Sequence, residues 1–161
     1  MSLVLYRVEL LVFELDDIRY AVRLEAVQEV VRAVAVTPLP GAPSAVHGVI
    51  DVRGVVTPVF DLRARLGGAG RDVDVADQFI LALAGSRRVA LHVDRVDWMA
   101  EADDAAVTAT RARLPGLPHV SGVTNSADGL VLIHDLETFL SDDEAAALDR
   151  AVATASAAGG P

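Results

Sequence analysis

The segment Gly48–Gly67, GVIDVRGVVTPVFDLRARLG, constrains the fold of this chain more than any other part. Two short runs rich in β-branched residues, Val49–Val52 and Val55–Phe60, flank the pair Arg53-Gly54. Glycine adopts a positive φ without steric cost, so Gly54 predicts a tight turn or a bulge between two strands. Arg53 is unusual here, because a guanidinium in so apolar a run must reach water, a carboxylate or a partner.

The second half of this segment predicts how the strand ends. Pro58 has no amide hydrogen, which favours an edge strand or a bulge over a central strand. Asp61 is a good helix N-cap residue, and Leu62–Leu66 is expected to form a short helical turn that stops at Gly67-Gly68.

Alternating apolar and polar residues predict strands along most of the remaining chain. The segment Glu25–Val36 fits both a helical turn and a strand, and we interpret it as a turn of helix leading into a strand. Asp16-Asp17 is expected to be the turn of a hairpin between Glu9–Leu15 and Ile18–Leu24. The other expected strand pairs are Gln78–Leu83 with Arg88–Asp94 and His119–Val123 with Leu130–His134, with a further strand at Val96–Ala100.

The C-terminal part is expected to be helical. Ser141 and Glu144 have the spacing of a capping box, which predicts a helix that continues to about Ala155. About nine or ten short strands precede it, and this pattern favours a mainly β architecture of small barrels. The order of a strand pair, a strand and an Asp-Leu turn occurs in both halves. We therefore predict one domain, 1–157, with two lobes divided roughly at 67–76, and a flexible tail at 158–161.

The charge of the chain argues against a nucleic-acid partner. Its 161 residues carry 14 lysines and arginines against 23 aspartates and glutamates, a formal net charge of −9. Affinity for phosphate backbones and for anionic membranes depends on basic residues, so both partners are disfavoured. No apolar run reaches the roughly 18 residues of a transmembrane helix, and a cytoplasmic protein without direct membrane insertion is expected.

The sequence offers little evidence of catalysis. It lacks G-x-S-x-G, H-E-x-x-H, P-loop and G-x-G-x-x-G motifs, and it has no cysteine. Its histidines are not at local metal-ligand spacing, so we expect no catalytic residue, metal or cofactor. His92 with Asp94, or His134 with Asp135, leaves one alternative, a small metal-dependent or His/Asp hydrolase on a β-barrel.

The segment from Gly48 to Leu66 resembles the signature of the CheW family, the adaptors of bacterial chemosensory arrays, whose usual form is G-V-I-N-L-R-G-x-V-x-P-V-x-D-L-R. Asp51 departs from it, because the family usually has Asn there, and His92 and His134 replace aliphatic residues. Four more segments resemble the family in the same order along the chain: LVFELDDIRYAVRLEAVQEVVR, TPLPGAPSAVHG, VALHVDRV and LVLIHDLETFL.

The resemblance implies a fold and a function. Family members have two intertwined five-stranded, SH3-like β-barrels around a shared hydrophobic core, and they are not enzymes. The implied function is to couple the cytoplasmic helical-hairpin tips of chemoreceptors, the methyl-accepting chemotaxis proteins, to the regulatory domain of a CheA-type histidine kinase. The chain would then be recruited to the inner face of the membrane through receptor arrays.

The resemblance also implies which residues bind a partner. Arg53 of the signature is expected to pair with Glu29, either as a structural ion pair or as part of a partner surface. The implied partner-binding residues are Val27, Glu29, Val30, Gly48 and Arg53, although a valine in a β protein is more often core. An alternative keeps the CheW fold but makes it a scaffold of a non-chemotaxis signalling pathway.

Overall fold

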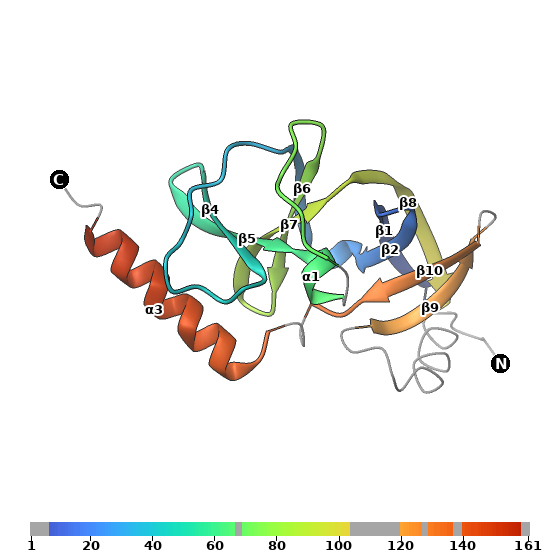
Figure 1. Cartoon of the computed structure of the whole chain (residues 1–161). Coiled ribbons are helices and arrows are strands. Elements are labelled where there is room, and N and C mark those ends of the chain that lie inside the picture. Colours follow the sequence, from blue (N-terminus) through green and yellow to red (C-terminus); the bar gives the residue numbers. More distant parts are fainter. Residues whose placement is uncertain (1–6, 67–68, 104–119, 127–128, 137–139, 159–161) are drawn as a thin grey trace.

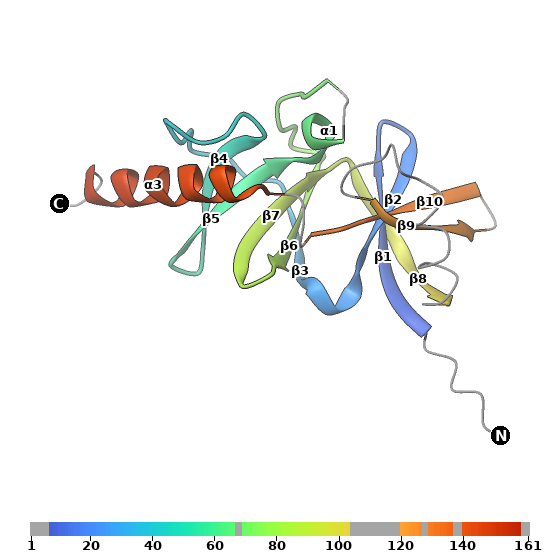
Figure 2. The same ribbon diagram turned by 90° about the horizontal axis from the view of Figure 1, so that it is seen from below.

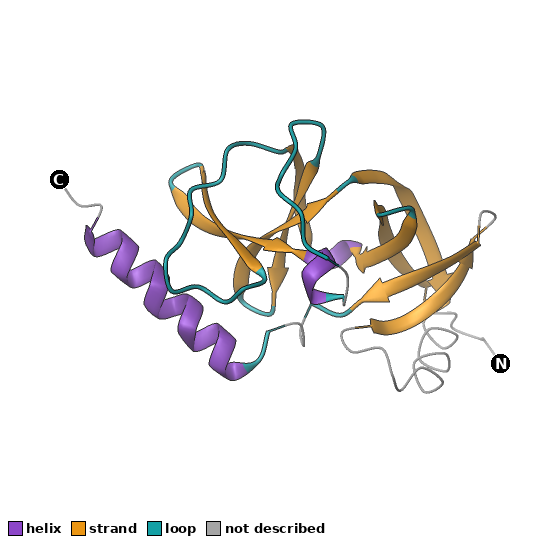
Figure 3. Cartoon of the chain, viewed as in Figure 1, coloured by secondary structure: helices purple, strands orange, loops and turns teal. Residues whose placement is uncertain are grey.

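The structure, a computed structural model, describes residues 7–66, 69–103, 120–126, 129–136 and 140–158 (Figure 1). Strands dominate the described residues, as the alternating sequence predicts (Figure 3). The strands are β1 (Arg7–Leu15), β2 (Ile18–Arg23), β3 (Val27–Arg32), β4 (Val46–Val52), β5 (Val55–Asp61), β6 (Gln78–Ala84), β7 (Arg87–Val93), β8 (Arg95–Asp103), β9 (Val120–Ser126) and β10 (Gly129–His134). The helices are the 3₁₀ turn η1 (Leu24–Ala26), α1 (Leu62–Arg65) and α3 (Asp142–Ala158).

These strands form two five-stranded sheets. The first has the order β8-β1-β2-β10-β9 and the second the order β3-β6-β7-β5-β4. The mainly β fold of two five-stranded units is therefore confirmed. The predicted division of the lobes at 67–76 is corrected by this strand order, because β1 and β2 pair with the C-terminal strands while β3, β4 and β5 pair with β6 and β7. The chain begins in one sheet, builds the other and then returns, so the sheets are intertwined.

Strand β1 shows why the two sheets form one structure. Successive side chains of a strand point to opposite faces. Leu11, Phe13 and Leu15 join a buried cluster that includes residues of both sheets and of α3, whereas Leu10 and Val12 join a cluster confined to the first sheet. A third cluster lies within the second sheet, around Phe79 and Leu81. The hydrophobic core therefore has a central part that both sheets share.

Two hairpins confirm their predicted turns. Asp16 and Asp17 connect β1 to β2 with φ values of 50° and 66°. Arg53 and Gly54 connect β4 to β5 with φ values of 50° and 85°. Two successive residues with positive φ are typical of the type I′ turn, whose twist matches that of the flanking strands.

The two α-helices begin at the predicted caps. The Asp61 side chain accepts a hydrogen bond from the Arg63 amide, which starts α1. Ser141 and Glu144 exchange hydrogen bonds of 3.1 Å in a capping box at the start of α3. Helix α3 follows β10 of the first sheet but lies alongside the second sheet in both views (Figures 1 and 2). Its Leu148 and Ala151 are buried in the shared core.

The ambiguous segment after β2 is a turn followed by a strand, as we interpret it from sequence. The turn is η1, and β3 then pairs with β6. The predicted tail, 158–161, lies outside the described residues except for Ala158, which is the last residue of α3. Within the described ranges, no helix is both long enough and apolar enough to cross a membrane.

Candidate partner-binding site

The β4–β5 hairpin presents Arg53 at its tip. The Asp51 side chain accepts a hydrogen bond of 2.6 Å from the Gly54 amide and so holds the turn. Asparagine, the residue usual at this position in the family, also offers a side-chain oxygen for this contact. The departure at Asp51 therefore preserves the turn and adds a negative charge beside Arg53.

Arg53 contacts Glu29 across the second sheet. Its Nη2 nitrogen lies 3.0 Å from Oε1 and 2.8 Å from Oε2 of Glu29. Glu29 belongs to β3 and Arg53 to the turn that follows β4, and β3 and β4 are the two edge strands of the sheet. The ion pair is possible because the sheet curls until its edges approach one another. The side chains are 75% and 37% exposed respectively, so the pair is accessible from solvent.

Gly48 lies where the chain leaves no room for a side chain. It has a φ of 153°, and a Cβ built on it would lie 2.1 Å from the carbonyl oxygen of Thr37. The backbone of Thr37 pairs with that of Val49 through two hydrogen bonds, of 2.8 and 2.9 Å. Gly48 therefore permits the proline-rich connector to close against β4, and this backbone role accounts for the glycine. A contact between Gly48 and a partner stays a prediction.

Val27 and Val30 are half-buried on β3 and pack against the shared core. A shift of register between Val27 and Glu29 places both valines against that cluster, although they are an odd number of residues apart. Only part of each side chain is accessible to a partner, so their contribution to a binding surface stays a prediction.

Two exposed valines adjoin Arg53 and were not singled out from sequence. Val55 is 41% exposed and Val56 is 48% exposed. Neighbouring residues of a strand face opposite sides, so exposure of both means that the hairpin tip extends beyond the body of the sheet. The run Val55-Val56, which breaks the apolar–polar alternation directly after the turn, is the sequence signal that could have revealed it. Together Glu29, Arg53, Val55 and Val56 form what we call the hairpin surface.

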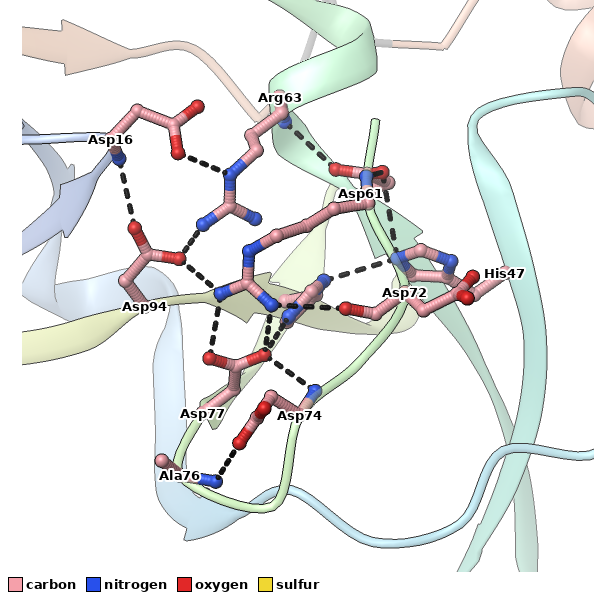
Figure 4. Close-up of polar contacts among 11 residues, drawn as sticks. Asp16, His47, Asp61, Arg63, Asp72, Asp74, Ala76, Asp77 and Asp94 are labelled. Carbon is pink, nitrogen blue, oxygen red and sulfur yellow. Dashed lines mark hydrogen bonds and ion pairs between the residues drawn. The ribbon is translucent and has the colours of Figure 1, made fainter. Parts of the chain in front are cut away.

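A second polar cluster lies at the other end of β4 and β5 (Figure 4). His47 Nε2 lies 3.0 Å from Nδ1 of His92, whose Nε2 lies 2.6 Å from Oδ2 of Asp77. His92 therefore does not pair with Asp94, which the sequence left as an alternative. Asp94 instead contacts Arg63 and Arg71 and accepts a hydrogen bond from the Asp16 amide.

Burial and hydrogen bonding fix the charges in this cluster. Burial lowers the pKa of His92, although Asp77 opposes the shift, so His92 is neutral near pH 7. Burial raises the pKa of Asp77, but the hydrogen bonds from Arg71, the Asp74 amide and His92 outweigh it and hold that pKa well below its usual range. His134 lies in the first sheet, on β10, whereas His92 lies in the second, so the two histidines of the sequence alternatives occupy different sheets.

Comparison with known proteins identifies the family. The model of the CheW-like domain matches residues 9–144. A "Chemotaxis protein CheW" of Rhizobium meliloti (strain 1021) is 37% identical over 102 residues, which cover 63% of this chain and 66% of that protein, just under two thirds of its length. Another of the same name, from Klebsiella aerogenes, is 29% identical over 149 residues, covering 88% of this chain and 86% of the relative.

A solved structure has the same fold. The crystal structure of the scaffolding protein TtCheW from Thermoanaerobacter tengcongensis superposes with a TM-score of 0.75 and 24% sequence identity, covering 86% of this chain and 91% of that one. The expectation that this chain is not an enzyme agrees with the family match. The chain belongs to the CheW family, whose members are non-enzymatic scaffolds of chemotaxis signalling.

Proposed function

We propose that this protein couples the cytoplasmic tips of chemoreceptors to the regulatory domain of a CheA-type histidine kinase. The observation that carries the proposal is the exposed Arg53–Glu29 pair, which stands beside two exposed valines in a chain of this family. The pair is accessible and its neighbours are apolar, a combination that suits recognition of another protein. The site of action would be cytoplasmic, at the inner face of the membrane, through the receptor arrays.

The mechanism is positional and needs no cofactor. One surface of the adaptor holds the receptor and another holds the kinase, and a signal passes as a change in the relative stability of the bound geometries. A ligand shifts such an equilibrium only by its difference in affinity for the two geometries. The adaptor therefore needs surfaces that hold its partners in a defined orientation, and the β4–β5 hairpin, whose turn is held by the Asp51 side chain, would supply one.

The receptor tip is a helical hairpin, and such a partner presents an apolar stripe with helical spacing. Val56 offers apolar area to that stripe, with Val55 on the other side of the hairpin tip, and the exposed parts of Val27 and Val30 would extend it along β3. Glu29 and Arg53 would fix the register, because each offers hydrogen-bonding groups at the rim. This assignment keeps the residues that the resemblance implies and adds the exposed valines.

The test is a paired titration with a receptor tip fragment and with the kinase regulatory domain of the same organism. Val56→Asp puts a charge into the proposed apolar contact, and we expect at least a tenfold loss of affinity for the receptor fragment, about 1.4 kcal/mol. Affinity for the kinase should be unchanged if the kinase uses another surface. Because Val56 is 48% exposed, this variant should fold, whereas Val30→Asp would also disturb the core.

A matched control is Leu83→Asp, which adds a charge at a residue of β6 that is 36% exposed and does not belong to the hairpin surface. It should bind both partners normally. Unchanged receptor affinity of a folded Val56→Asp would contradict the assignment of this surface. Loss of kinase binding alone would assign the hairpin surface to the kinase. Binding of neither partner by the unmodified protein would favour a scaffold of another signalling pathway.

A further inference from the structure

Three side chains that are distant in sequence meet at one end of the second sheet. His47 is on β4, Asp61 is the last residue of β5, and His92 is on β7. These strands are neighbours in the order β7-β5-β4. Each residue offers a metal-ligating atom, and the three atoms lie within 4.8 Å of one another. The expectation from sequence, which was based on local spacing, did not bring these residues together.

The backbone explains why the donors converge. Asp61 and His92 are register partners in the parallel pairing of β5 and β7. Val46 pairs with Phe60 and Gly48 with Val59, so His47 is the extra residue of a β-bulge. A bulge changes the direction of a side chain relative to the regular ladder. In this bulge the imidazole of His47 is directed toward Asp61 (Figure 4), and its Nε2 also contacts Nδ1 of His92.

The distances between the donor atoms suit a small transition-metal cation. Nε2 of His47 lies 3.0 Å from Nδ1 of His92 and 3.6 Å from Oδ2 of Asp61. Ligands at the usual Zn–N distance of about 2.1 Å in a tetrahedron are about 3.4 Å apart. The two measured edges lie on either side of that value, so a cation needs only small side-chain adjustments to contact these donors.

Asp77 fixes His92 in the orientation that a metal ligand requires. Its carboxylate only accepts hydrogen bonds, so Nε2 of His92 carries the proton and donates to it over 2.6 Å. Nδ1 of His92 therefore keeps its lone pair and directs it at His47. A carboxylate behind a histidine is the usual outer-shell partner of metal-bound imidazole. Without a metal, Nε2–H of His47 donates to Nδ1 of His92, and a cation would replace that proton.

The charges around the cluster favour a cation. Arg71 and Arg63 are the basic residues of the network, and Arg71 is engaged with Asp77 and Asp94. The aspartates of the network outnumber these two arginines; they are Asp16, Asp61, Asp72, Asp74, Asp77 and Asp94 (Figure 4). His47 also lines a cleft of about 390 Å³ together with Asp72 and Asp74, so an ion has a path to the cluster from solvent.

We propose that His47, Asp61 and His92 form a binding site for a divalent transition-metal cation of the Zn²⁺ or Co²⁺ type. Two imidazole nitrogens and one carboxylate oxygen are ligands that these ions accept, and a water molecule would complete a tetrahedral coordination. The bound ion joins β4, β5 and β7 and so stabilises the second sheet. This site is independent of the partner-binding proposal, because it uses none of the residues of the hairpin surface.

The test is a metal titration of the full chain without an affinity tag, after treatment with a chelator. Added Co²⁺ should bind with a stoichiometry of one and produce the visible absorption of a four-coordinate cobalt site, and Zn²⁺ should abolish that absorption. The melting temperature should rise with the concentration of the free ion, because a ligand that binds only the folded state stabilises it.

His47→Gln is the main variant, since the His47 side chain is 18% exposed and its loss should not prevent folding. It should weaken Co²⁺ binding by more than the roughly 10–100-fold that removal of an outer-shell partner costs. Asp61→Asn, which retains a helix-capping side chain, should also weaken it. Glu25→Gln is the control, because it removes an exposed carboxylate of η1 that does not belong to this cluster, and its affinity for Co²⁺ should be unchanged.

Two results would overturn the proposal. One is the absence of saturable, one-to-one binding of Co²⁺ and Zn²⁺ by the unmodified chain. The other is unchanged binding by folded His47→Gln and Asp61→Asn, which would assign the bound ion to other residues.

Discussion

At the scale of single residues, Arg53 is in a backbone conformation that does not suit it. A non-glycine residue with positive φ costs roughly 1–2 kcal/mol, and Arg53 has a φ of 50°. Its ion pair with Glu29 is exposed, and such pairs contribute about 0–1 kcal/mol. The pair does not offset the backbone cost, so stability alone does not account for arginine at this turn. The partner contact proposed for Arg53 would account for it.

The first prediction separates the contribution of Arg53 to stability from its contribution to partner binding. Arg53→Ala should lower the free energy of unfolding by at most about 1 kcal/mol, because only an exposed ion pair is lost. Arg53→Gly removes the same guanidinium but relieves the backbone, so it should be as stable as the unmodified chain or slightly more stable. Both variants should bind the receptor fragment more weakly. Urea unfolding and binding titration measure the two quantities.

Arg32→Ala is the matched control, since Arg32 is an exposed arginine on β3 of the same sheet. Arg32→Ala should change neither the free energy of unfolding nor the affinity for the receptor fragment. A loss of several kcal/mol on Arg53→Ala would mark a structural ion pair, and normal binding by a folded Arg53→Gly would remove Arg53 from the partner surface.

At the scale of elements, charged pairs attach α3 to the second sheet. Arg65 of α1 donates to Glu144, and Arg87 of β7 donates to Asp149 at 2.7 and 3.1 Å. The hydrogen bond from Arg65 lowers the pKa of Glu144, burial opposes the shift, and the Ser141 amide adds to it. The hydrogen bond from Arg87 lowers the pKa of Asp149 in the same direction. Both carboxylates therefore favour the docked helix while they are ionised.

The second prediction concerns the pH dependence of α3. Because the pKa of Glu144 is lower in the folded state, its stabilisation is complete above the unfolded value of about 4.3 and is lost as the pH falls through the folded value. The effect should be below about 1 kcal/mol, since the side chain is partly solvated. The protection of the α3 amides from hydrogen exchange, relative to the intrinsic exchange rate at each pH, should decrease between about pH 5 and pH 3.

Glu144→Gln should reduce this pH dependence, whereas Glu25→Gln, which changes an exposed glutamate of η1, should retain it. If α3 exchanges equally fast in the unmodified chain and in Glu144→Gln at every pH, the Arg65–Glu144 contact does not hold the helix.

At the scale of the whole molecule, the shared core couples the two sheets. Phe13 is fully buried in the cluster that contains residues of both sheets, and it stacks on Tyr20 with ring centroids 6.1 Å apart. Arg63 of α1 adds a polar link, because it contacts Asp16 in the β1–β2 turn and Asp94 after β7. If either sheet loses its packing against the shared core, apolar side chains of the other sheet become exposed to water.

The third prediction follows from this coupling. Phe13→Ala should destabilise the protein by about 3–5 kcal/mol, the usual cost for a buried phenylalanine. The loss should appear in both sheets together, although β1 belongs only to the first. Hydrogen exchange resolved by segment measures it, with β6 and β7 as the reporters of the second sheet.

Ile18→Ala is the control, because Ile18 is 49% exposed on β2 and its truncation should change stability by less than about 0.5 kcal/mol. Loss of protection confined to the first sheet on Phe13→Ala would mean that the two sheets unfold independently.

The features that depend on near neighbours can be predicted from the amino-acid sequence. The turns at Asp16-Asp17 and Arg53-Gly54, the caps at Asp61 and Ser141, and the alternating runs all lie where local signals predict them. Each depends on φ preferences, hydrogen bonds within a few residues or a period of two, and all of these can be seen in a short window. The Glu29–Arg53 contact came only from the resemblance to the family, since no local rule links two residues 24 positions apart.

The assignment of strands to the two sheets depends on long-range packing and could not be predicted from local patterns. The repeated pattern suggested a division at 67–76, but β1 and β2 are buried on both faces and can be satisfied only by pairing with distant strands. The expectation that Pro58 favours an edge strand is not met, because β5 lies inside its sheet, between β7 and β4. Its pairing with β7 begins only at Val59, beyond the residue without an amide hydrogen. His47 and His92, 45 residues apart, meet through a bulge and a parallel register that burial selects. Turns, caps and strand periodicity depend on adjacent residues. The pairing of distant strands depends instead on which combination of strands buries every apolar face at once.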